Sequence, residues 1–263
     1  MTATDPDLLL IEDRAHVRVL SLNRPDRHNA LNDPLMYAYR VAVGEALADP
    51  SVRCIVLRGE GASFCSGRDT ADFGKHGSGE PVIDWLAAGQ RTIAALLDSP
   101  KPIIAAMKGH VIGGGFEMCL AADIRIGAVD MRAALPEVGF ASIPDNGGTQ
   151  ILTALVGPGR AKELVLAGRR INADEALAWG IVNRVVAVDE LDEVVFGLAQ
   201  EIAQRSPLAV RLAKQLVDSC WADCFQRGLR NELVAQTAMF NSADYAEAAT
   251  ARREQRAPVY TGR

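Results

Sequence analysis

Three consecutive glycines, at positions 113–115, are followed two residues later by Glu117. Three glycines in a row destabilise any regular element, so they are best explained where the backbone must turn sharply or approach a ligand closely. If a helix follows them, its unpaired N–H groups and the positive end of its dipole face this turn. A carbonyl oxygen that acquires negative charge during a reaction is a natural ligand for such a turn.

A second glycine-containing loop, FCSGRD at residues 64–69, also follows a run of apolar residues. This loop could supply a second backbone N–H to the same oxygen, and two such donors from separate loops make an oxyanion hole. Spacing alone favours the alternative that both loops are only tight turns. Isolated glycine clusters are weak signals, and the chain has no phosphate-loop pattern.

Two glutamates near these loops could act as general acid and base. Glu117 stands in the first turn after the glycines, where a glutamate often only complements the helix dipole. Glu137 follows Leu135-Pro136, where an acid is often only a surface-loop residue. A catalytic interpretation requires that the two converge, because paired carboxylates in a partly dry pocket can hold a water molecule and divide the roles of base and acid.

A third acid, Asp145, lies in the sequence Pro-Asp-Asn-Gly, which is strong turn chemistry. Its expected role is in this turn or as the cap of a helix that begins near Thr149. A role as a third catalytic acid is the alternative.

Short apolar strands must position these loops. Residues 16–22 alternate in polarity as a half-buried strand does, and residues 54–57 and 103–107 are continuous apolar runs typical of strands covered on both faces. Asp33 is predicted to cap a helix that has Pro34 at its first position. A glycine-rich turn follows each buried strand, which favours an α/β architecture with its chemistry at the strand ends.

The C-terminal part of the chain differs from this core. Apolar residues recur there at helical spacing, as at Leu191, Val195, Leu198 and Ile202, and no strand is predicted after Val188. The sequence therefore predicts a core over residues 1–188, which carries the active site, and a helical region over residues 189–263.

Composition argues against several classes of protein. The 263 residues include 28 Lys and Arg against 33 Asp and Glu, a formal net charge of −5, so no broad attraction for nucleic acid or anionic lipid is expected. The longest stretch without a charged residue, 146–159, is rich in glycine, whereas a membrane-spanning helix needs about 20 apolar residues. The N-terminus lacks the basic start and longer apolar centre of a secretion signal, which favours a cytoplasmic location.

Five scattered cysteines and four isolated histidines suggest neither a disulfide framework nor a metal site.

Several motifs in order along the chain make it resemble the crotonase, or enoyl-CoA hydratase/isomerase, superfamily over essentially its whole length. The matching segments are NRPDRHNAL at 23–31, FCSGRD at 64–69, GGGFE at 113–117, LPE at 135–137, IPDNGGT at 143–149 and GIVN at 180–183. A set of motifs at family spacing is far more specific than any one of them.

The resemblance implies an α/β fold built as a spiral of ββα units, with a C-terminal α-helical region that forms trimers, usually paired into hexamers. It also implies a coenzyme A thioester as substrate and no metal or redox cofactor. In the family pattern the backbone amides of Arg68 and Gly114 bind the thioester oxygen. The residues that would line the coenzyme channel are Arg27, His28, Ala30, Ser66, Asp69, Thr70 and Ala71.

The acids at positions 117 and 137 distinguish reactions within the family. Hydratases that resemble this chain keep glutamates at both positions, whereas many double-bond isomerases keep only one. The implied reaction is syn addition of water to the 2,3 double bond of a 2-enoyl-CoA, or the reverse dehydration. Glu117 would orient and deprotonate the water that attacks the β-carbon, and Glu137 would deliver a proton to the α-carbon. The oxyanion hole would stabilise the enolate-like charge in hydration and isomerisation alike.

Two positions depart from the hydratase pattern. Arg68 replaces a small residue, and its long cationic side chain could narrow the acyl pocket or contact a polar substrate. Asp145 stands where typical hydratases have glycine and where some enoyl- and dienoyl-CoA isomerases have an acid. Isomerisation by Glu137 and Asp145 is therefore the main alternative. The nucleophile of an aryl-CoA dehalogenase branch occupies the same position, but that branch differs from this chain at position 137.

Three further alternatives arise from the resemblance. Residues 168–183 and 256–263 are also similar to carnitinyl-CoA dehydratases. Clp-type proteases share the spiral fold, which makes Ser66 and His110 candidates for a serine hydrolase, although neither lies in a nucleophile-elbow pattern. Some relatives bind RNA or are inactive; the acidic net charge and the two glutamates argue against such a binding role.

Overall fold

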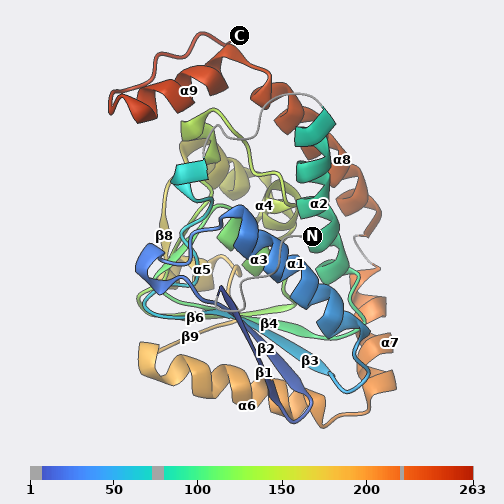
Figure 1. The fold of residues 1–263 in the computed structure, drawn as a ribbon. Helices are drawn as coiled ribbons and strands as arrows, with labels where there is room; N and C mark the ends of the chain where they lie inside the picture. Colours follow the sequence, from blue (N-terminus) through green and yellow to red (C-terminus); the bar gives the residue numbers. More distant parts are fainter. Residues whose placement is uncertain (1–7, 73–79, 220–221, 263) are drawn as a thin grey trace.

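The computed structural model describes residues 8–72, 80–219 and 222–262. Its largest element is a six-stranded sheet with the strand order β1-β2-β3-β4-β6-β9 (Figure 1). β1 and β2 are antiparallel, and all other neighbours in this sheet are parallel. The bounds are β1 (Leu9–Arg14), β2 (Val17–Leu22), β3 (Cys54–Gly59), β4 (Ile103–Met107), β6 (Ile124–Ala128) and β9 (Arg184–Val186).

A smaller sheet has the order β5-β7-β8, formed by β5 (His110–Ile112), β7 (Arg132–Ala134) and β8 (Ile171–Asn172). Only Lys108 and Gly109 separate β4 from β5. Gly109 has a φ of 51°, in the left-handed region that favours glycine, so the chain turns sharply between the two sheets here. The glycines at 113–115 follow β5 directly.

The strands lie where the apolar patterns predict them. β4 spans the predicted run, β3 extends the predicted run 54–57 by two residues, and β2 begins one residue after the predicted start. Every residue of β4 is buried, as are five of the six residues of β3. Burial on both faces explains why these two strands are continuously apolar.

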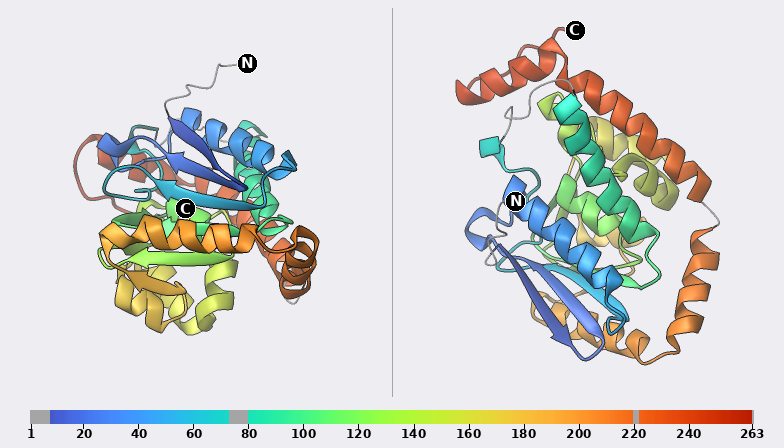
Figure 2. Two further views of the ribbon diagram at one scale, coloured as in Figure 1. Left: turned by 90° about the horizontal axis from the view of Figure 1, so that it is seen from below. Right: turned by 45° about the vertical axis from the view of Figure 1, so that its right-hand side comes forward.

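The helices cover both faces of the larger sheet (Figure 2). Their bounds are α1 (Asp33–Ala48), α2 (Glu80–Leu97), α3 (Gly114–Leu120), α4 (Gly148–Ala167), α5 (Ala173–Ala178), α6 (Leu191–Ala203), α7 (Pro207–Asp218), α8 (Ala222–Phe240) and α9 (Ala243–Arg253). Short 3-10 turns add η1 (Pro25–Arg27), η2 (Thr70–Asp72), η3 (Glu137–Phe140) and η4 (Val188–Glu190).

Two hydrophobic clusters separate the two faces. On one face α6 packs on the sheet through Leu191, Val195, Ala199 and Ala203. On the other face the cluster includes residues of α1, α3, α4 and α8. The helical pattern predicted at Leu191, Val195, Leu198 and Ile202 is confirmed by α6. α6 lies after residue 188 in the chain but packs on the sheet of the core. The division into a core (1–188) and a helical region (189–263) therefore remains a prediction.

The predicted cap of α1 is wrong. Asn32, and not Asp33, is the capping residue, since its side chain accepts a hydrogen bond from the Leu35 amide at 3.0 Å. A capping oxygen must reach an amide two or three residues ahead, and Asn32 has that spacing. The Asp33 carboxylate instead forms an ion pair with Arg68 at 2.8 Å.

The last helices lie against the site-bearing part of the molecule. α8 packs against α2 and α4, and α9 packs against α8 and η3. At the chain end, the Tyr260 hydroxyl donates to the Gly139 carbonyl at 3.0 Å. Within the described residues, no helix combines the length and apolar character needed to cross a membrane.

Candidate active site

The two glycine loops lie side by side. Cys65 and Val111 form a parallel bridge, in which the Ile112 amide donates to the Cys65 carbonyl at 2.9 Å. Three residues beyond this pair along the two chain segments are Arg68 and Gly114. The sequence-predicted donors therefore stand at matching positions in two adjacent loops.

Close approach explains the glycines. Gly67 and Gly113 have φ values of 89° and 55°, and a Cβ on Gly113 would lie 3.8 Å from the Gly67 Cα. A Cβ on Gly115 would lie 2.5 Å from the Cβ of Cys65, which real side chains do not tolerate. Only glycine allows the second loop to turn and still contact the first.

Glu117 is buried in the first turn of α3, with 1% of its surface exposed. Its Oε1 accepts hydrogen bonds from the backbone amides of Asn146 and Gly148, at 2.8 and 3.0 Å. Burial, and then the charges of Asp145, Glu137 and Glu232, raise the pKa of Glu117 well above its usual value. A carboxyl group with a raised pKa holds a proton more readily than an exposed glutamate does, as proton-transfer groups in active sites often do.

Glu137, at the start of η3, faces the glycine turn. A Cβ on Gly113 would come within 2.9 Å of Glu137 Oε1. Glu137 Oε2 is buried and has no hydrogen-bond partner among the described residues. Burial raises the pKa of Glu137 to about 8, a value that keeps the carboxyl group protonated at neutral pH.

Asp145 lies near both glutamates but does not cap α4, which corrects one of its two predicted structural roles. α4 begins at Gly148, and its first amides donate to glutamates from α3 and α8. The Asp145 Oδ1 accepts from the Asn146 side chain at 2.5 Å. Burial and then the charge of Glu232 raise the pKa of Asp145 to about 7. The alternative role of Asp145, as a third catalytic acid, stays a prediction.

Glu232, on α8, was missed by the sequence analysis. It is 4% exposed and accepts from the Gly147 amide at 2.8 Å and from the Thr149 hydroxyl at 2.7 Å. A signal was present, because Phe225, Leu229, Glu232 and Gln236 recur at helical spacing and are all buried. A glutamate within an otherwise buried stripe of a helix indicates a specific partner.

The predicted coenzyme-channel residues lie on two adjacent segments. Leu31 and Arg68 form a parallel bridge, and the Ser66 amide donates to the His28 carbonyl at 2.9 Å. An ion pair of 2.8 Å between Arg24 and Asp69 ties the segments together. Exposed residues of this group form a rim beside the glycine loops, namely Arg27, His28, Thr70 and Ala71, with Ala30, Ser66 and Asp69 partly buried.

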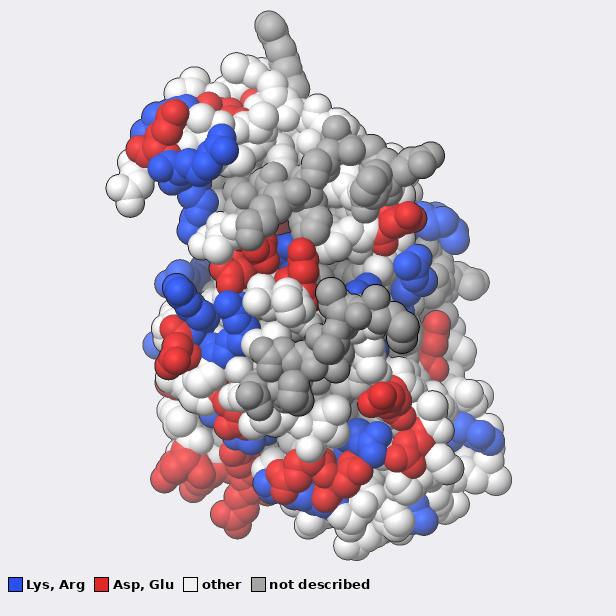
Figure 3. All heavy atoms as spheres, viewed as in Figure 1, with Lys and Arg blue, Asp and Glu red and all other residues white. Residues whose placement is uncertain are grey.

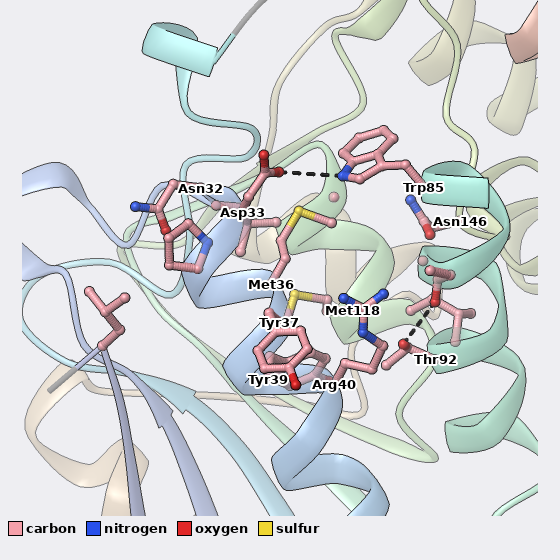
Figure 4. A pocket seen from close by; sticks show the side chains of 17 residues that line it. Asn32, Asp33, Met36, Tyr37, Tyr39, Arg40, Trp85, Thr92, Met118 and Asn146 are labelled. Atoms are coloured by element: carbon pink, nitrogen blue, oxygen red, sulfur yellow. Dashed lines mark hydrogen bonds between the residues drawn. The ribbon is translucent and has the colours of Figure 1, made fainter. Parts of the chain in front are cut away.

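The Arg68 side chain turns toward α1 and α2. Its guanidinium group pairs with Asp33 at 2.8 Å and lies 4.8 Å from the ring centre of Trp85. The Trp85 ring N–H also donates to Asp33 Oδ1 at 3.3 Å (Figure 4). The long cation thus links the first glycine loop to both helices.

A cavity of about 740 Å³ adjoins the second glycine loop. Gly114 and Asn146 are among its lining residues, and residues of α1 and α2 form most of its wall, including Met36, Tyr37 and Trp85 (Figure 4). Its volume falls within the range of about 300–1,000 Å³ typical of small-molecule sites.

The serine-hydrolase alternative finds no support in the described geometry. The Ser66 hydroxyl donates to the Arg27 carbonyl at 3.2 Å, and the His110 ring packs edge-on against His28 at 5.0 Å. No hydrogen bond between Ser66 and His110 occurs in the part of the chain that the structure describes.

The cysteines whose side chains the structure describes offer no reactive thiol. Cys54, Cys65 and Cys119 are buried free thiols, and burial raises their pKa values. Cys220 lies outside the described residues. Within residues 8–72, 80–219 and 222–262, no group of three or more His, Cys, Asp or Glu side chains could hold a metal ion.

A mixed α/β fold with buried acids beside two touching glycine loops defines a protein of the crotonase class. The family model for enoyl-CoA hydratase/isomerase matches residues 12–263, and the chain belongs to this family. It is 36% identical over 249 residues to crotonyl-CoA hydratase of Syntrophomonas wolfei, covering 94% of this chain and 95% of that protein. It is 35% identical over 248 residues to carnitinyl-CoA dehydratase of Salmonella typhi, with 93% and 94% covered.

Solved structures agree with this assignment. The crystal structure of an enoyl-CoA hydratase from Mycobacterium avium subsp. paratuberculosis matches 97% of this chain and 98% of its own, with a TM-score of 0.86 and 26% sequence identity. The predicted α/β, crotonase-like fold is therefore confirmed, and the trimeric assembly stays a prediction.

Proposed function

We propose that this protein is an enoyl-CoA hydratase, which adds water to the 2,3 double bond of a 2-enoyl-CoA thioester or catalyses the reverse dehydration. The observation that carries the proposal is the pair Glu117 and Glu137, two buried carboxyl groups close enough for the charge of Glu137 to raise the pKa of Glu117. Glu137 faces the Gly113 turn, and Glu117 stands in the first turn of the helix that follows it. Acids in partly dry surroundings, with pKa values moved toward neutrality, are typical of proton-transfer sites.

The surroundings of the two glutamates differ. Burial raises the pKa of both, but two amides donate to Glu117 and partly offset this effect, whereas Glu137 Oε2 has no donor among the described residues. The two amide donors are the reason to propose Glu117 as the base. In hydration, Glu117 would take a proton from the water as its oxygen bonds to the β-carbon. Glu137 would give its proton to the α-carbon, so that one water molecule is added in total.

The thioester oxygen would be held by the amides of Arg68 and Gly114. Negative charge develops on this oxygen when water attacks, so two donors aimed at it lower the barrier. The rim residues, Arg27, His28, Ala30, Ser66, Asp69, Thr70 and Ala71, would line the coenzyme channel. The reaction transfers protons and a hydroxyl group and needs no external electron acceptor, so we propose no further metal or redox cofactor.

Isomerisation of an enoyl- or dienoyl-CoA is the second candidate. The observation that favours it is Asp145, whose raised pKa of about 7 would let it move a proton together with Glu137. Dehydration of a carnitinyl-CoA-like thioester is a further candidate within the hydratase chemistry, supported by the similarity to that relative.

We further propose assembly as a homotrimer or homohexamer through the C-terminal helices. α7 exposes a row of apolar side chains, Leu208, Leu212, Leu216 and Val217, which water disfavours. Acidic and basic side chains are interspersed on the face seen in Figure 3, which together with the net charge of −5 supports neither nucleic acid nor membrane as a partner. We propose that the protein acts in the cytoplasm.

A panel of thioesters tests these alternatives. Purified protein is mixed with 2-enoyl-, 3-enoyl-, dienoyl- and hydroxyacyl-CoA substrates, without added metal, and products are separated by chromatography. Hydration of a 2-enoyl-CoA is the expected result. If double bonds move, hydration is undetectable and Asp145→Asn abolishes the movement, the isomerase alternative is correct. Turnover of none of these thioesters would favour a binding protein.

A further inference from the structure

Two buried glutamates share four consecutive backbone amides, those of residues 146–149, in alternation. One glutamate is Glu117, on α3, and the other is Glu232, on α8. Asn146 and Gly148 donate to Glu117 at 2.8 and 3.0 Å, and Gly147 and Thr149 donate to Glu232 at 2.8 and 3.2 Å. The start of α4 is thus held by two carboxylates, one from the core and one from the C-terminal helices.

Glu232 is a buried acid whose hydrogen bonds, within the described residues, all come from the start of α4. Its side chain is buried, and its sequence separation from Gly147 is 85 residues. Burial of a carboxylate is costly unless several donors satisfy it, and the Thr149 hydroxyl adds a third hydrogen bond at 2.7 Å. An apolar residue at this position would leave the amides of Gly147 and Thr149 without this acceptor, so Glu232 does more than fill space.

α8 holds the same loop at a second point. One turn beyond Glu232, the Gln236 side chain accepts from the Ile143 amide at 3.1 Å and donates to the Ser142 hydroxyl at 2.6 Å. From α2, the Gln90 side chain donates to the Asp145 carbonyl at 2.9 Å. The loop before α4 is therefore fixed by side chains of α2 and α8, and its conformation depends on them.

We propose that Glu232 is a positioning residue for the reaction, which holds the amides of Gly147 and Thr149 so that the alternate amides of Asn146 and Gly148 stay on the Glu117 carboxylate. Glu232 itself touches neither substrate nor reacting atoms. The inference rests on the proposed function in that Glu117 is taken as the base. It gives α8 a part in catalysis in addition to packing.

The kinetic test is a double-mutant cycle. Glu232→Gln keeps the size of the side chain, but one end becomes an NH₂ group that cannot accept from an amide. Because small displacements of a reacting group are costly, kcat for a 2-enoyl-CoA should fall about tenfold or more while KM changes less than about twofold. In the Glu117→Gln background the same exchange should change kcat by less than about twofold, because Glu232 acts through Glu117.

Glu201→Gln is the matched control. Glu201 is an exposed carboxylate on α6. It pairs with Arg205, just beyond the end of that helix, and not with the loop before α4. Its replacement should leave kcat and KM unchanged. If Glu232→Gln lowers kcat equally in both backgrounds, Glu232 supports the fold in general and the inference is wrong.

Amide hydrogen exchange gives a readout that needs no turnover. In Glu232→Gln, the amides of Asn146 and Gly148 should exchange faster, although neither donates to Glu232. Faster exchange confined to Gly147 and Thr149 would overturn the inference. A wild-type protein that hydrates no thioester would defeat the proposed function instead, and this exchange result would still decide whether Glu232 positions the donors to Glu117.

A second variant covers the case in which Glu232→Gln does not fold. Thr149→Val removes the hydroxyl donor to Glu232. The charge of Glu232 and its hydrogen bonds to the backbone amides of residues 147 and 149 remain in place. We expect kcat to fall about threefold in the wild-type background and to stay constant in the Glu117→Gln background. Equal losses in both backgrounds would again contradict the inference.

Discussion

The two faces of the six-stranded sheet bury different chemistry. Against α6, strand residues such as Val19, Val56 and Ile104 pack on Leu191 and Val195. On the other face the apolar cluster reaches α3 and α8, which also bury Glu117 and Glu232. Apolar burial stabilises the fold directly, at about 25 cal/mol per Å². A buried carboxylate costs stability unless its hydrogen bonds are satisfied. The two faces therefore differ in what they bury: one buries apolar side chains, and the other also buries carboxyl groups whose hydrogen bonds must be satisfied.

Replacement of the candidate base should give the largest effect on the site-bearing face. Glu117→Gln removes the group that accepts the proton of water, and general bases typically contribute about 10²–10⁴-fold to rate. We expect kcat for 2-enoyl-CoA hydration to fall by that factor, while urea unfolding shows no loss of stability because a buried charge has been removed. A fall of less than threefold would mean that Glu117 is not the base.

A substitution that creates a cavity on the face covered by α6 should lower stability and leave kcat almost unchanged. Ile104→Ala removes a fully buried side chain next to α6, and such changes lower the free energy of unfolding by about 2–5 kcal/mol. The folded variant should retain kcat within about twofold. Urea titration and initial rates, measured on the same preparation, check both statements. A large loss of kcat without loss of stability would contradict the division between the faces.

A single methyl group can test the contact between α4 and the base. A Cβ on Gly148 would lie 2.7 Å from Glu117 Oε1, so Gly148→Ala should displace the carboxylate and lower kcat about tenfold. Gly159→Ala is the matched control, because it lies in the same helix and a Cβ there would meet nothing within 4 Å. Equal kcat values for the two variants would show that the position of Glu117 does not depend on this contact.

The smallest expected effect is on the pH dependence of stability. The raised pKa of Glu137, about 8, means that the folded protein binds a proton more tightly than the unfolded chain. This contribution is complete below the usual glutamate pKa of about 4.5 and is lost as pH rises toward 8. Thermal unfolding of wild type and Glu137→Gln should therefore differ more and more between pH 5 and 8, with the wild type losing relative stability. A constant difference would contradict the raised pKa.

Sequence patterns predict the frame of the site well, because they report local physics. The apolar runs 54–57 and 103–107 identify β3 and β4, and the spacing around Val195 identifies α6. The glycine loops that follow these strands are predicted as possible partners in an oxyanion hole, although spacing alone favours two separate tight turns. Each of these inferences depends on residues close in the chain.

Long-range partners are what the sequence does not reveal. The acceptors for the amides at the start of α4 lie on α3 and α8, so Asp145 was assigned a capping role that glutamates from other helices perform. Glu232 has no motif around it, and its buried stripe becomes meaningful only when α8 is seen against α4. Asn32, and not Asp33, caps α1 because its side-chain oxygen reaches the Leu35 amide. The Asp33 carboxylate is paired with Arg68, which is distant in sequence.

The late position of Glu232 in the chain affects when the protein can begin to work. A nascent polypeptide leaves the ribosome from its N-terminus, so the sheet, both glycine loops and α4 emerge before α8 does. Until then the amides of Gly147 and Thr149 lack their acceptor. A chain that ended before α8 would carry both candidate proton-transfer acids but lack the Glu232 acceptor for these amides. If Glu232 positions Glu117 as proposed, we expect such a chain to turn over substrate more slowly than the full chain.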